Sequence, residues 1–250
     1  TVDTSVSGIV PGYEHVLPQR PAWHACACCP PNLARLIASL GKYLWSEDEG
    51  TVYSHLFIGS EVETRYGRIS MTSGYPWEGK AEYTIHDGGD FALTIHVPQH
   101  AVKVSLHVNG EEVSNVTADG YCRIQRNWQP DDRIAVEFDM PVRRIHAHPR
   151  LRDAAGKVAL ARGPLVYCVE DADHEAILSG IVLPADAAIN TSESSAEGMV
   201  VLHAEGTAQS SSDELYSNRT ISTKAVQIRA IPYFAWGNRT LGNMQVWIRE

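Results

Sequence analysis

Residues 104–113 read Val-Ser-Leu-His-Val-Asn-Gly-Glu-Glu-Val, and this stretch indicates how most of the chain folds. Apolar and polar residues alternate along it, which is the pattern of a strand with one buried face. The dipeptide Asn109-Gly110 then supplies two residues that tolerate positive φ, as a two-residue hairpin turn requires. The sequence therefore predicts an antiparallel hairpin made of residues 104–108 and 111–113.

Short runs rich in Val, Ile, Tyr and Thr flank this hairpin on both sides, and turn signals separate them. The earlier runs are 52–58, 61–66, 68–73, 80–86, 91–97, 102–108, 121–125 and 133–138, and the later ones are 144–147, 157–161, 165–170, 180–183, 199–204, 225–230 and 244–249. The Ser- and Asn-rich segments 190–195 and 209–212 favour exposed loops. Strands at this density predict a mainly β fold of two consecutive antiparallel β-sandwich domains, divided near Pro149.

The chain ahead of these strands predicts a single helix. Leucine or isoleucine at positions 33, 36, 37, 40 and 44 follows the spacing of one apolar helical face. Pro31 suits a first helical turn, and Asp48-Glu49-Gly50 ends the pattern. We therefore expect a helix from about Asn32 to Trp45, preceded by an irregular segment rich in proline.

The overall composition excludes several classes of protein. The 250 residues carry 21 Lys and Arg against 30 Asp and Glu, and 44% are apolar, which allows a sizeable core. A formal net charge of −9 without a basic cluster argues against nucleic acid as a partner. No run approaches the ~18 apolar residues of a membrane helix, so we expect no membrane partner. Residues 1–4 show no signal segment, and we expect a cytoplasmic bacterial protein.

Three of the five cysteines, Cys26, Cys28 and Cys29, lie within four residues just before the predicted helix. The partial positive charge of a helix N-terminus favours thiolate over thiol, and thiolates are both nucleophiles and soft metal ligands. A closed zinc site needs four donors, and the adjacent pair is expected to point in different directions. Together with His24, the cluster predicts half a metal site completed from elsewhere. The alternative is that small buried residues pack against the helix.

Other residues with chemical potential favour structural roles. His146 and His148 share one face of a strand, where a metal site competes with a solvated strand end. Cys122 and Cys168 lie singly in strand patterns and are assigned to packing. Six aromatic residues that could stack on sugar rings are expected instead to fill cores or domain contacts: Tyr75, Trp77, Trp128, Tyr233, Phe234 and Trp236.

The segment Cys26-Ala27-Cys28-Cys29-Pro30-Pro31-Asn32-Leu33-Ala34-Arg35 resembles the signature of glycoside hydrolase family 127, the β-L-arabinofuranosidases. Further segments continue the resemblance in order: 74–77 (GYPW), 140–144 (MPVRR), 163–168 (GPLVYC), 231–239 (IPYFAWGNR) and 244–248 (MQVWI). The resemblance therefore covers almost the whole chain.

This resemblance implies an architecture that begins with an (α/α)6 barrel carrying the active site and continues with two β-sandwich domains. The predicted helix would then be the last helix of the barrel. The implied domains are 1–48, a C-terminal remnant of the barrel with the cysteine cluster, then 49–148 and 149–250, the two sandwiches.

The resemblance also implies a zinc ion (Zn2+), bound by a glutamate and three cysteines, two of which match Cys28 and Cys29. Cys28 would be the nucleophile of a retaining glycosidase and would form a thioglycosyl intermediate on an oligosaccharide or glycoconjugate substrate, whereas Cys29 would be a ligand only. The acid/base glutamate and the remaining ligands would lie upstream. Neither Asp3 nor Glu14 sits in a matching context, so the chain alone is expected to be inactive.

Two functions fit the sequence. The chain is either the C-terminal part of a zinc-thiolate β-L-arabinofuranosidase or a non-catalytic β-sandwich module that binds carbohydrate or supports assembly. In both cases the sandwich surfaces offer contacts for a homodimer.

Overall fold

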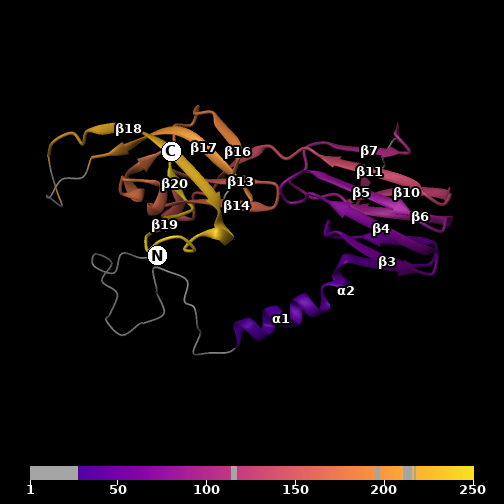
Figure 1. Ribbon diagram of the computed structural model, residues 1–250. Coiled ribbons are helices and arrows are strands. Elements are labelled where there is room, and N and C mark those ends of the chain that lie inside the picture. The colour runs from indigo at the N-terminus through magenta and orange to yellow at the C-terminus, as the bar shows by residue number, and fades with distance from the viewer. Residues whose placement is uncertain (1–27, 114–116, 195–197, 211–215, 217) are drawn as a thin grey trace. The chain divides into compact units, whose positions relative to one another are not determined.

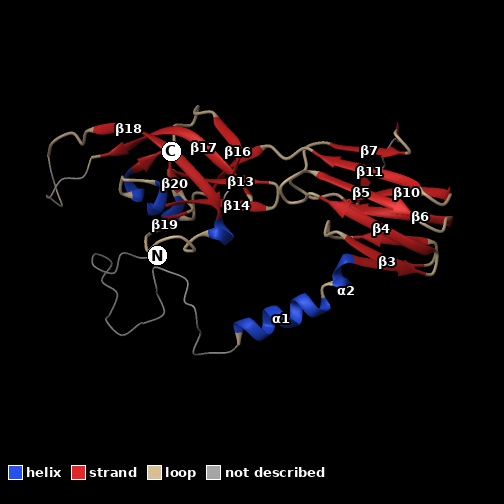
Figure 2. Ribbon diagram, viewed as in Figure 1, coloured by secondary structure: helices blue, strands red, loops and turns tan. Residues whose placement is uncertain are grey.

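The computed structural model describes residues 28–113, 117–194, 198–210, 216 and 218–250, which form two compact units (Figure 1). The first unit ends at Pro141 and the second begins at Val142. This division lies earlier than the expected boundary near Pro149, because strand β12 (Val142–His146) pairs along its whole length with β13 (Lys157–Arg162) of the second unit. Figure 2 shows that strands dominate both units.

The first unit is a sandwich of two sheets with one hydrophobic core. The five-stranded sheet has the order β1 (Trp45–Asp48), β2 (Thr51–Ser54), β6 (Gly89–His96), β10 (Tyr121–Trp128) and β9 (Thr117–Ala118). The six-stranded sheet has the order β3 (Ser60–Thr64), β4 (Gly67–Ser73), β5 (Lys80–Ile85), β11 (Asp132–Phe138), β7 (Val104–Val108) and β8 (Glu111–Glu112). Alternate residues turn inward, so Tyr83 and Ile134 of the larger sheet share the core with Leu93 of the smaller one.

The hairpin predicted at residues 104–113 is confirmed. Val108 pairs with Glu111 across a two-residue loop, in which Asn109 and Gly110 have φ angles of 53° and 85°. Positive φ at both positions is the turn geometry that matches the right-handed twist of the two strands. Antiparallel pairing also dominates the rest of the described chain, with β2–β6 and the short pair β15 (Ile181–Val182) and β20 (Ile248–Arg249) as parallel exceptions.

The predicted helix is present as two helices, α1 (Cys29–Ser39) and α2 (Gly41–Leu44). It begins earlier than expected, and it ends before Trp45, whose extended backbone opens β1. The Trp45 ring is buried against Tyr83, and its Nε1–H donates to the hydroxyl of Ser60 at 3.0 Å. This burial turns the chain from helix to strand. Within the described ranges, no helix is both long enough and apolar enough to cross a membrane.

The second unit contains a nine-stranded sheet whose ladder of hydrogen bonds closes on itself. The closed ring follows the order β13, β20, β15, β17 (Met199–Gln209), β18 (Thr223–Pro232) and β14 (Leu165–Glu170), and β14 pairs again with β13. Strands β12, β16 (Ile189–Ser194) and β19 (Met244–Gln245) are attached to this ring. The ring encloses a core that includes Val158, Tyr167 and Leu202.

The prediction of an exposed loop at residues 190–195 is wrong. Residues 189–194 form β16, which pairs with β17 at every position. The sequence gives no strand pattern here, because β16 lies beside β17 at the margin of the sheet, where exposed Ser, Asn and Thr side chains are tolerated.

Gly79, just before β5, approaches the backbone of β11 too closely to carry a side chain. A Cβ atom built on Gly79 would overlap the carbonyl oxygen of Phe138, and the Phe138 N–H already donates to the Gly79 carbonyl at 2.6 Å. We expect Gly79→Ala to lower the free energy of unfolding by about 2 kcal/mol or more, because the two backbones can separate only by breaking this contact. Urea or thermal unfolding measures the loss.

Gly41→Ala is the matched control for this prediction. A Cβ atom on Gly41 meets nothing within 4 Å, and the residue lies in helix α2. Alanine should therefore leave the stability unchanged or raise it slightly. Equal losses for the two variants would contradict the steric explanation.

Candidate functional site

Cys28 and Cys29 lie at the N-terminus of α1. Cys28 is the N-cap residue with a helical backbone (φ −76°, ψ −44°), and its carbonyl accepts a hydrogen bond from the Asn32 N–H at 3.3 Å. Pro30 and Pro31 occupy the first turn. Because proline has no N–H, two donors that usually stand free at a helix start are absent here.

The two thiol groups of this pair converge. The Sγ atoms of Cys28 and Cys29 lie 3.6 Å apart, and both residues are exposed. The expectation that adjacent cysteines point in different directions is therefore wrong. Neither residue is buried within the described part of the chain, and the alternative of a packing role stays open.

The spacing of the two sulfurs fits two thiolates on one zinc ion. With Zn–S distances of about 2.3 Å and tetrahedral angles, two ligand sulfurs lie about 3.8 Å apart. The residues that the structure describes hold no group of three or more His, Cys, Asp or Glu side chains placed to bind a metal. His24 and Cys26 lie outside these residues. The pair can thus supply two of the four ligands, and the zinc site stays a prediction.

The apolar face of α1 is exposed. Leu33, Leu36 and Ile37 are 58%, 50% and 64% exposed, whereas Leu40 and Leu44 pack against the core of the first sandwich. No residue of α1 is buried by the described part of the chain. Three neighbouring aliphatic side chains in water are typical of a surface that another part of a protein covers.

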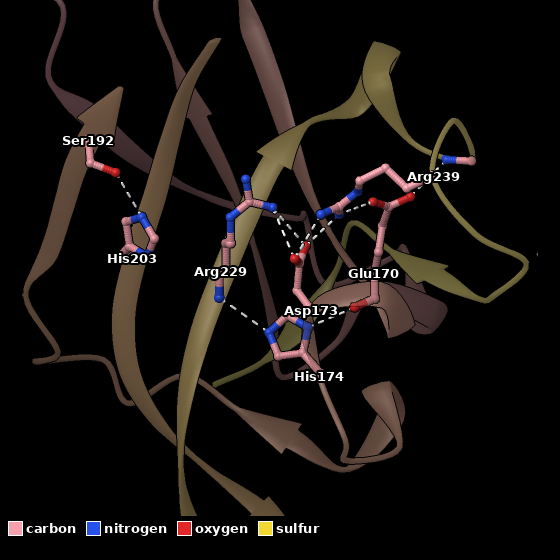
Figure 3. A network of polar contacts seen from close by, with 8 residues as sticks. Glu170, Asp173, His174, Ser192, His203, Arg229 and Arg239 are labelled. Atoms are coloured by element: carbon pink, nitrogen blue, oxygen red, sulfur yellow. Dashed lines mark hydrogen bonds and ion pairs between the residues drawn. The ribbon is translucent and has the colours of Figure 1, made fainter. Parts of the chain in front are cut away.

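A cluster of charged residues lies in the second unit, where β14 ends (Figure 3). Arg239 contacts Glu170 and both carboxylate oxygens of Asp173, and Arg229 donates to the same two oxygens of Asp173 at 3.0 Å. The other oxygen of Glu170 accepts the Gly237 N–H at 2.7 Å. All four carboxylate oxygens therefore have partners, and Arg239 links the two acids.

His174 belongs to the same cluster. Its Nδ1 lies 2.8 Å from the carbonyl oxygen of Glu170, and its Nε2 lies 3.2 Å from the backbone N–H of Arg229. Because a carbonyl only accepts and a backbone N–H only donates, Nδ1 carries the proton and Nε2 is the acceptor. Figure 3 shows the ring between the two segments that it joins. The imidazole is therefore a structural link.

The electrostatics of this cluster agree with a structural role. Burial alone would raise the pKa of Asp173, but the hydrogen bonds and charges of Arg239 and Arg229 outweigh it and hold the pKa below its usual range. Burial, assisted by the Glu170 charge, raises the pKa of the Cys168 thiol to about 12. The cluster thus combines fixed charges with an unreactive thiol. It stabilises the fold and offers no nucleophile.

Sequence reasoning missed this cluster because its partners are far apart in the chain. Arg239 lies 66 residues from Asp173 and 69 residues from Glu170, and no spacing rule connects them. The segment 231–239 contributed to the family resemblance, which was the one available signal.

The remaining predicted residues have structural surroundings. His146 Nε2 lies 2.8 Å from a carboxylate oxygen of Glu250, and His148 accepts the Arg150 N–H, which favours the solvated strand end over a metal site. The packing roles of Cys122 and Cys168 are confirmed, since both are buried. Of the six aromatic residues, Trp128 lies in the first core, whereas Tyr233 and Phe234 are exposed.

Two β-sandwich units behind a helix that begins with paired cysteines match the accessory portion of a glycoside hydrolase. Residues 51–140 match the model of the β-L-arabinofuranosidase GH127 middle domain, and residues 142–249 match that of the glycoside hydrolase family 127 C-terminal domain. The chain belongs to glycoside hydrolase family 127, of which it holds the middle and C-terminal domains.

Relatives of known sequence and structure agree with this membership. The chain is 33% identical to a non-reducing end β-L-arabinofuranosidase of Bifidobacterium longum, over 96% of this chain and 39% of that protein. It superposes on a GH127 β-L-arabinofuranosidase from Geobacillus stearothermophilus T6 with a TM-score of 0.88 and 41% identity, over 94% of this chain and 39% of that one. A structure described as a glycoside hydrolase gives 0.84 and 32%, over 98% and 43%. The chain thus spans about two fifths of the length of these relatives.

The charged cluster predicts a stability defect for Arg239→Ala. This change leaves the nearly buried carboxylate of Glu170 without its cationic partner and removes one of the two arginines on Asp173. We expect a loss of about 3 kcal/mol in the free energy of unfolding of the second unit, because an uncompensated buried charge is costly. Thermal unfolding measures it, with the exposed Arg150→Ala as a control that should change little. Equal unfolding temperatures for both variants would rule out a stabilising cluster.

The depressed pKa of Asp173 predicts a particular pH dependence. An acid with a lowered pKa in the folded state stabilises the protein above its unfolded pKa, and this contribution is lost as the pH falls through the folded pKa. The stability difference between the unchanged chain and Asp173→Asn should therefore be full near neutral pH and shrink below about pH 4. Unfolding temperatures measured as a function of pH test this. A difference that grows in acid would contradict it.

Proposed function

We propose that the protein to which this chain belongs is a retaining glycoside hydrolase that cleaves terminal β-L-arabinofuranosyl or closely related linkages, with Cys28 as its nucleophile. Membership of family 127 and the β-L-arabinofuranosidase activity of its relatives support the reaction class. The observation that carries the residue assignment is the exposed pair of sulfurs, 3.6 Å apart, at the start of α1.

Cys28 and Cys29 would hold a zinc ion together with ligands that the described residues do not supply. When bound, zinc keeps a coordinating sulfur deprotonated at neutral pH and fixes its direction. The chain itself contributes the position of the pair, at the start of α1 with Pro30 and Pro31 in the first turn.

The proposed reaction follows from a thiolate at Cys28. Its Sγ forms a bond to the anomeric carbon while the bond from that carbon to the leaving oxygen breaks, and an acid outside this chain protonates that oxygen. The conjugate base of that acid then takes a proton from water, whose oxygen bonds to the anomeric carbon as the carbon–sulfur bond breaks and the thiolate is restored. Two displacements at one carbon retain the configuration of the sugar. Cys29 acts as a ligand and forms no bond to the substrate.

The exposed face of α1 supports the wider architecture. We propose that Leu33, Leu36 and Ile37 pack against further helices of an (α/α)6 barrel that carries the acid/base residue and the remaining ligands. The chain by itself would then be inactive. The sandwiches alone also fit a module that binds carbohydrate without cleaving it, and the same experiment separates the two functions.

The test compares the 250-residue chain with a longer chain that includes the region upstream, each incubated with an aryl β-L-arabinofuranoside. We expect activity and bound zinc in the longer chain and no activity in the shorter one. Cys28→Ser in the longer chain should lower kcat about a thousandfold or more, because the nucleophile is lost. Cys29→Ser should lower both zinc content and activity.

Cys122→Ala is the matched control, because this cysteine is buried in the first sandwich and should affect neither measurement. Mass spectrometry of the trapped intermediate should place the sugar on the peptide that contains Cys28. Activity of the longer chain that survives Cys28→Ala would overturn the nucleophile assignment. Activity of neither chain on any arabinofuranoside would favour the binding module.

A further inference from the structure

The outer side of the five-stranded sheet carries a cluster of rings outside the proposed catalytic residues. Neighbouring core residues such as Leu93 and Ile95 point inward, so Thr94 between them faces outward. The strand register aligns Ser46, Tyr53, Thr94 and Arg123 in one row across four segments of this sheet. The outer side is therefore built from polar and aromatic residues, although the inner side is apolar.

Four half-buried rings gather here, and we call them the tyrosine face: Tyr53, His55, His96 and Tyr121. The rings of Tyr53 and His55 are parallel, with centroids 6.0 Å apart. The Tyr121 ring stands at 89° to the first and 87° to the second, at 6.2 and 5.8 Å. This arrangement offers two ring orientations to one ligand.

Hydrogen bonds hold the rings of the tyrosine face in place. His55 lies 2.7 Å from the Ser46 hydroxyl through Nε2 and 2.8 Å from the Tyr121 hydroxyl through Nδ1. The Tyr53 hydroxyl donates to Asp48 at 2.9 Å. Rings held before a ligand arrives bind it at a lower entropic cost.

Thr94 supplies a polar group without a partner beneath this surface. Its side chain is only 5% exposed, and its Oγ1 forms no hydrogen bond. A buried hydroxyl without a partner is costly, and native proteins keep few of them. Arg123 reaches from β10 to Thr51 on β2, with 2.9 Å between its Nη1 and the Thr51 hydroxyl, so this exposed side chain crosses the strand that carries Thr94. Because the Oγ1 of Thr94 is itself buried, a ligand hydroxyl reaches it when the Arg123 side chain moves aside, and it then satisfies Thr94.

We propose that the tyrosine face, with Thr94 and its polar rim, binds a neutral oligosaccharide. Sugar rings present apolar C–H faces that pack on aromatic rings, and their hydroxyls both donate and accept. The rim supplies acceptors in Asp48 and Asp90, donors in Arg123, and the amide of Gln125, which donates to Asp90 at 3.0 Å. Two carboxylates and one guanidinium leave no excess of positive charge, which suits a neutral polyhydroxy ligand better than an acidic one.

The protonation states of the two histidines agree with an uncharged ligand. Burial lowers the pKa of His55, as does the neighbouring charge of His96, and burial also lowers the pKa of His96. Both imidazoles are therefore neutral at pH 7. The site shares no residue with the cysteine pair, so it can bind a glycan whether or not the protein cleaves it.

The experiment titrates the 250-residue chain with a neutral arabino-oligosaccharide and, separately, with an acidic oligogalacturonide, and follows binding by NMR. We expect the neutral ligand to bind with a Kd on the order of 1 mM and the acidic one more weakly. Tyr121→Ala should weaken binding at least tenfold. Tyr43→Ala, which removes an exposed tyrosine of α2, should leave it unchanged.

Thr94→Val separates binding from folding. Valine keeps the shape of threonine and removes only the unpaired hydroxyl, so the unfolding temperature should stay the same or rise while the Kd increases severalfold. If Tyr121→Ala fails to fold, this variant decides. The proposal is overturned by absence of binding, by an unchanged Kd in Thr94→Val, or by tighter binding of the acidic ligand. None of these results bears on the nucleophile, because binding is measured without cleavage.

Discussion

A buried hydrogen bond between the two sheets of the first sandwich stabilises the packing at the point where the helix that begins at the cysteines joins the first strand. The hydroxyls of Tyr83 on β5 and Ser54 on β2 lie 2.9 Å apart, fully buried between the two sheets. Trp45 packs on the same Tyr83 ring, edge to face, with centroids 5.9 Å apart. Because a buried polar pair tolerates few alternative packings, it fixes where the strands begin and where α2 must end. The helices ahead of β1 are thus joined to the sandwich by the buried Trp45 together with Leu40 and Leu44.

Much of the fold could be predicted because alternation and turn chemistry are local signals. The hairpin around Asn109-Gly110 and the strand at 165–170 appear as the sequence indicates. The end of the helix was predicted to within one residue, because the apolar spacing stops at Leu44, where α2 ends, but the division into α1 and α2 could not be read from that spacing. The strand at 189–194 was missed, because pairing at a sheet margin does not require apolar residues.

The same distinction holds for the candidate functional residues: a local motif revealed the cysteines, whereas contacts between distant residues could not be predicted. The cysteine pair is a local motif, so its residues and helix position could be read from the sequence, although the convergence of the two sulfurs could not. The contacts of Arg239 with Glu170 and Asp173 join segments more than sixty residues apart, and only the fold brings them together. The tyrosine face could not be predicted from the sequence either. Its rings lie on or directly after three strands, β2, β6 and β10, and only the pairing of these strands brings them together.

The closed ladder of the second unit constrains how this domain is made during protein synthesis. The ring is completed by β20, where Ile248 and Arg249 pair with β13 and Arg249 also pairs with Val182 of β15. Glu250 adds a hydrogen bond to Gly156 and an ion pair to Arg144. A strand of two residues thus joins one segment made about 90 residues earlier and another made about 70 residues earlier, and the cost of closing such loops slows folding. Until residues 248 and 249 have left the ribosome, the ring has an open edge between β13 and β15. The first sandwich, whose strands are complete by residue 138, can fold well before that edge closes.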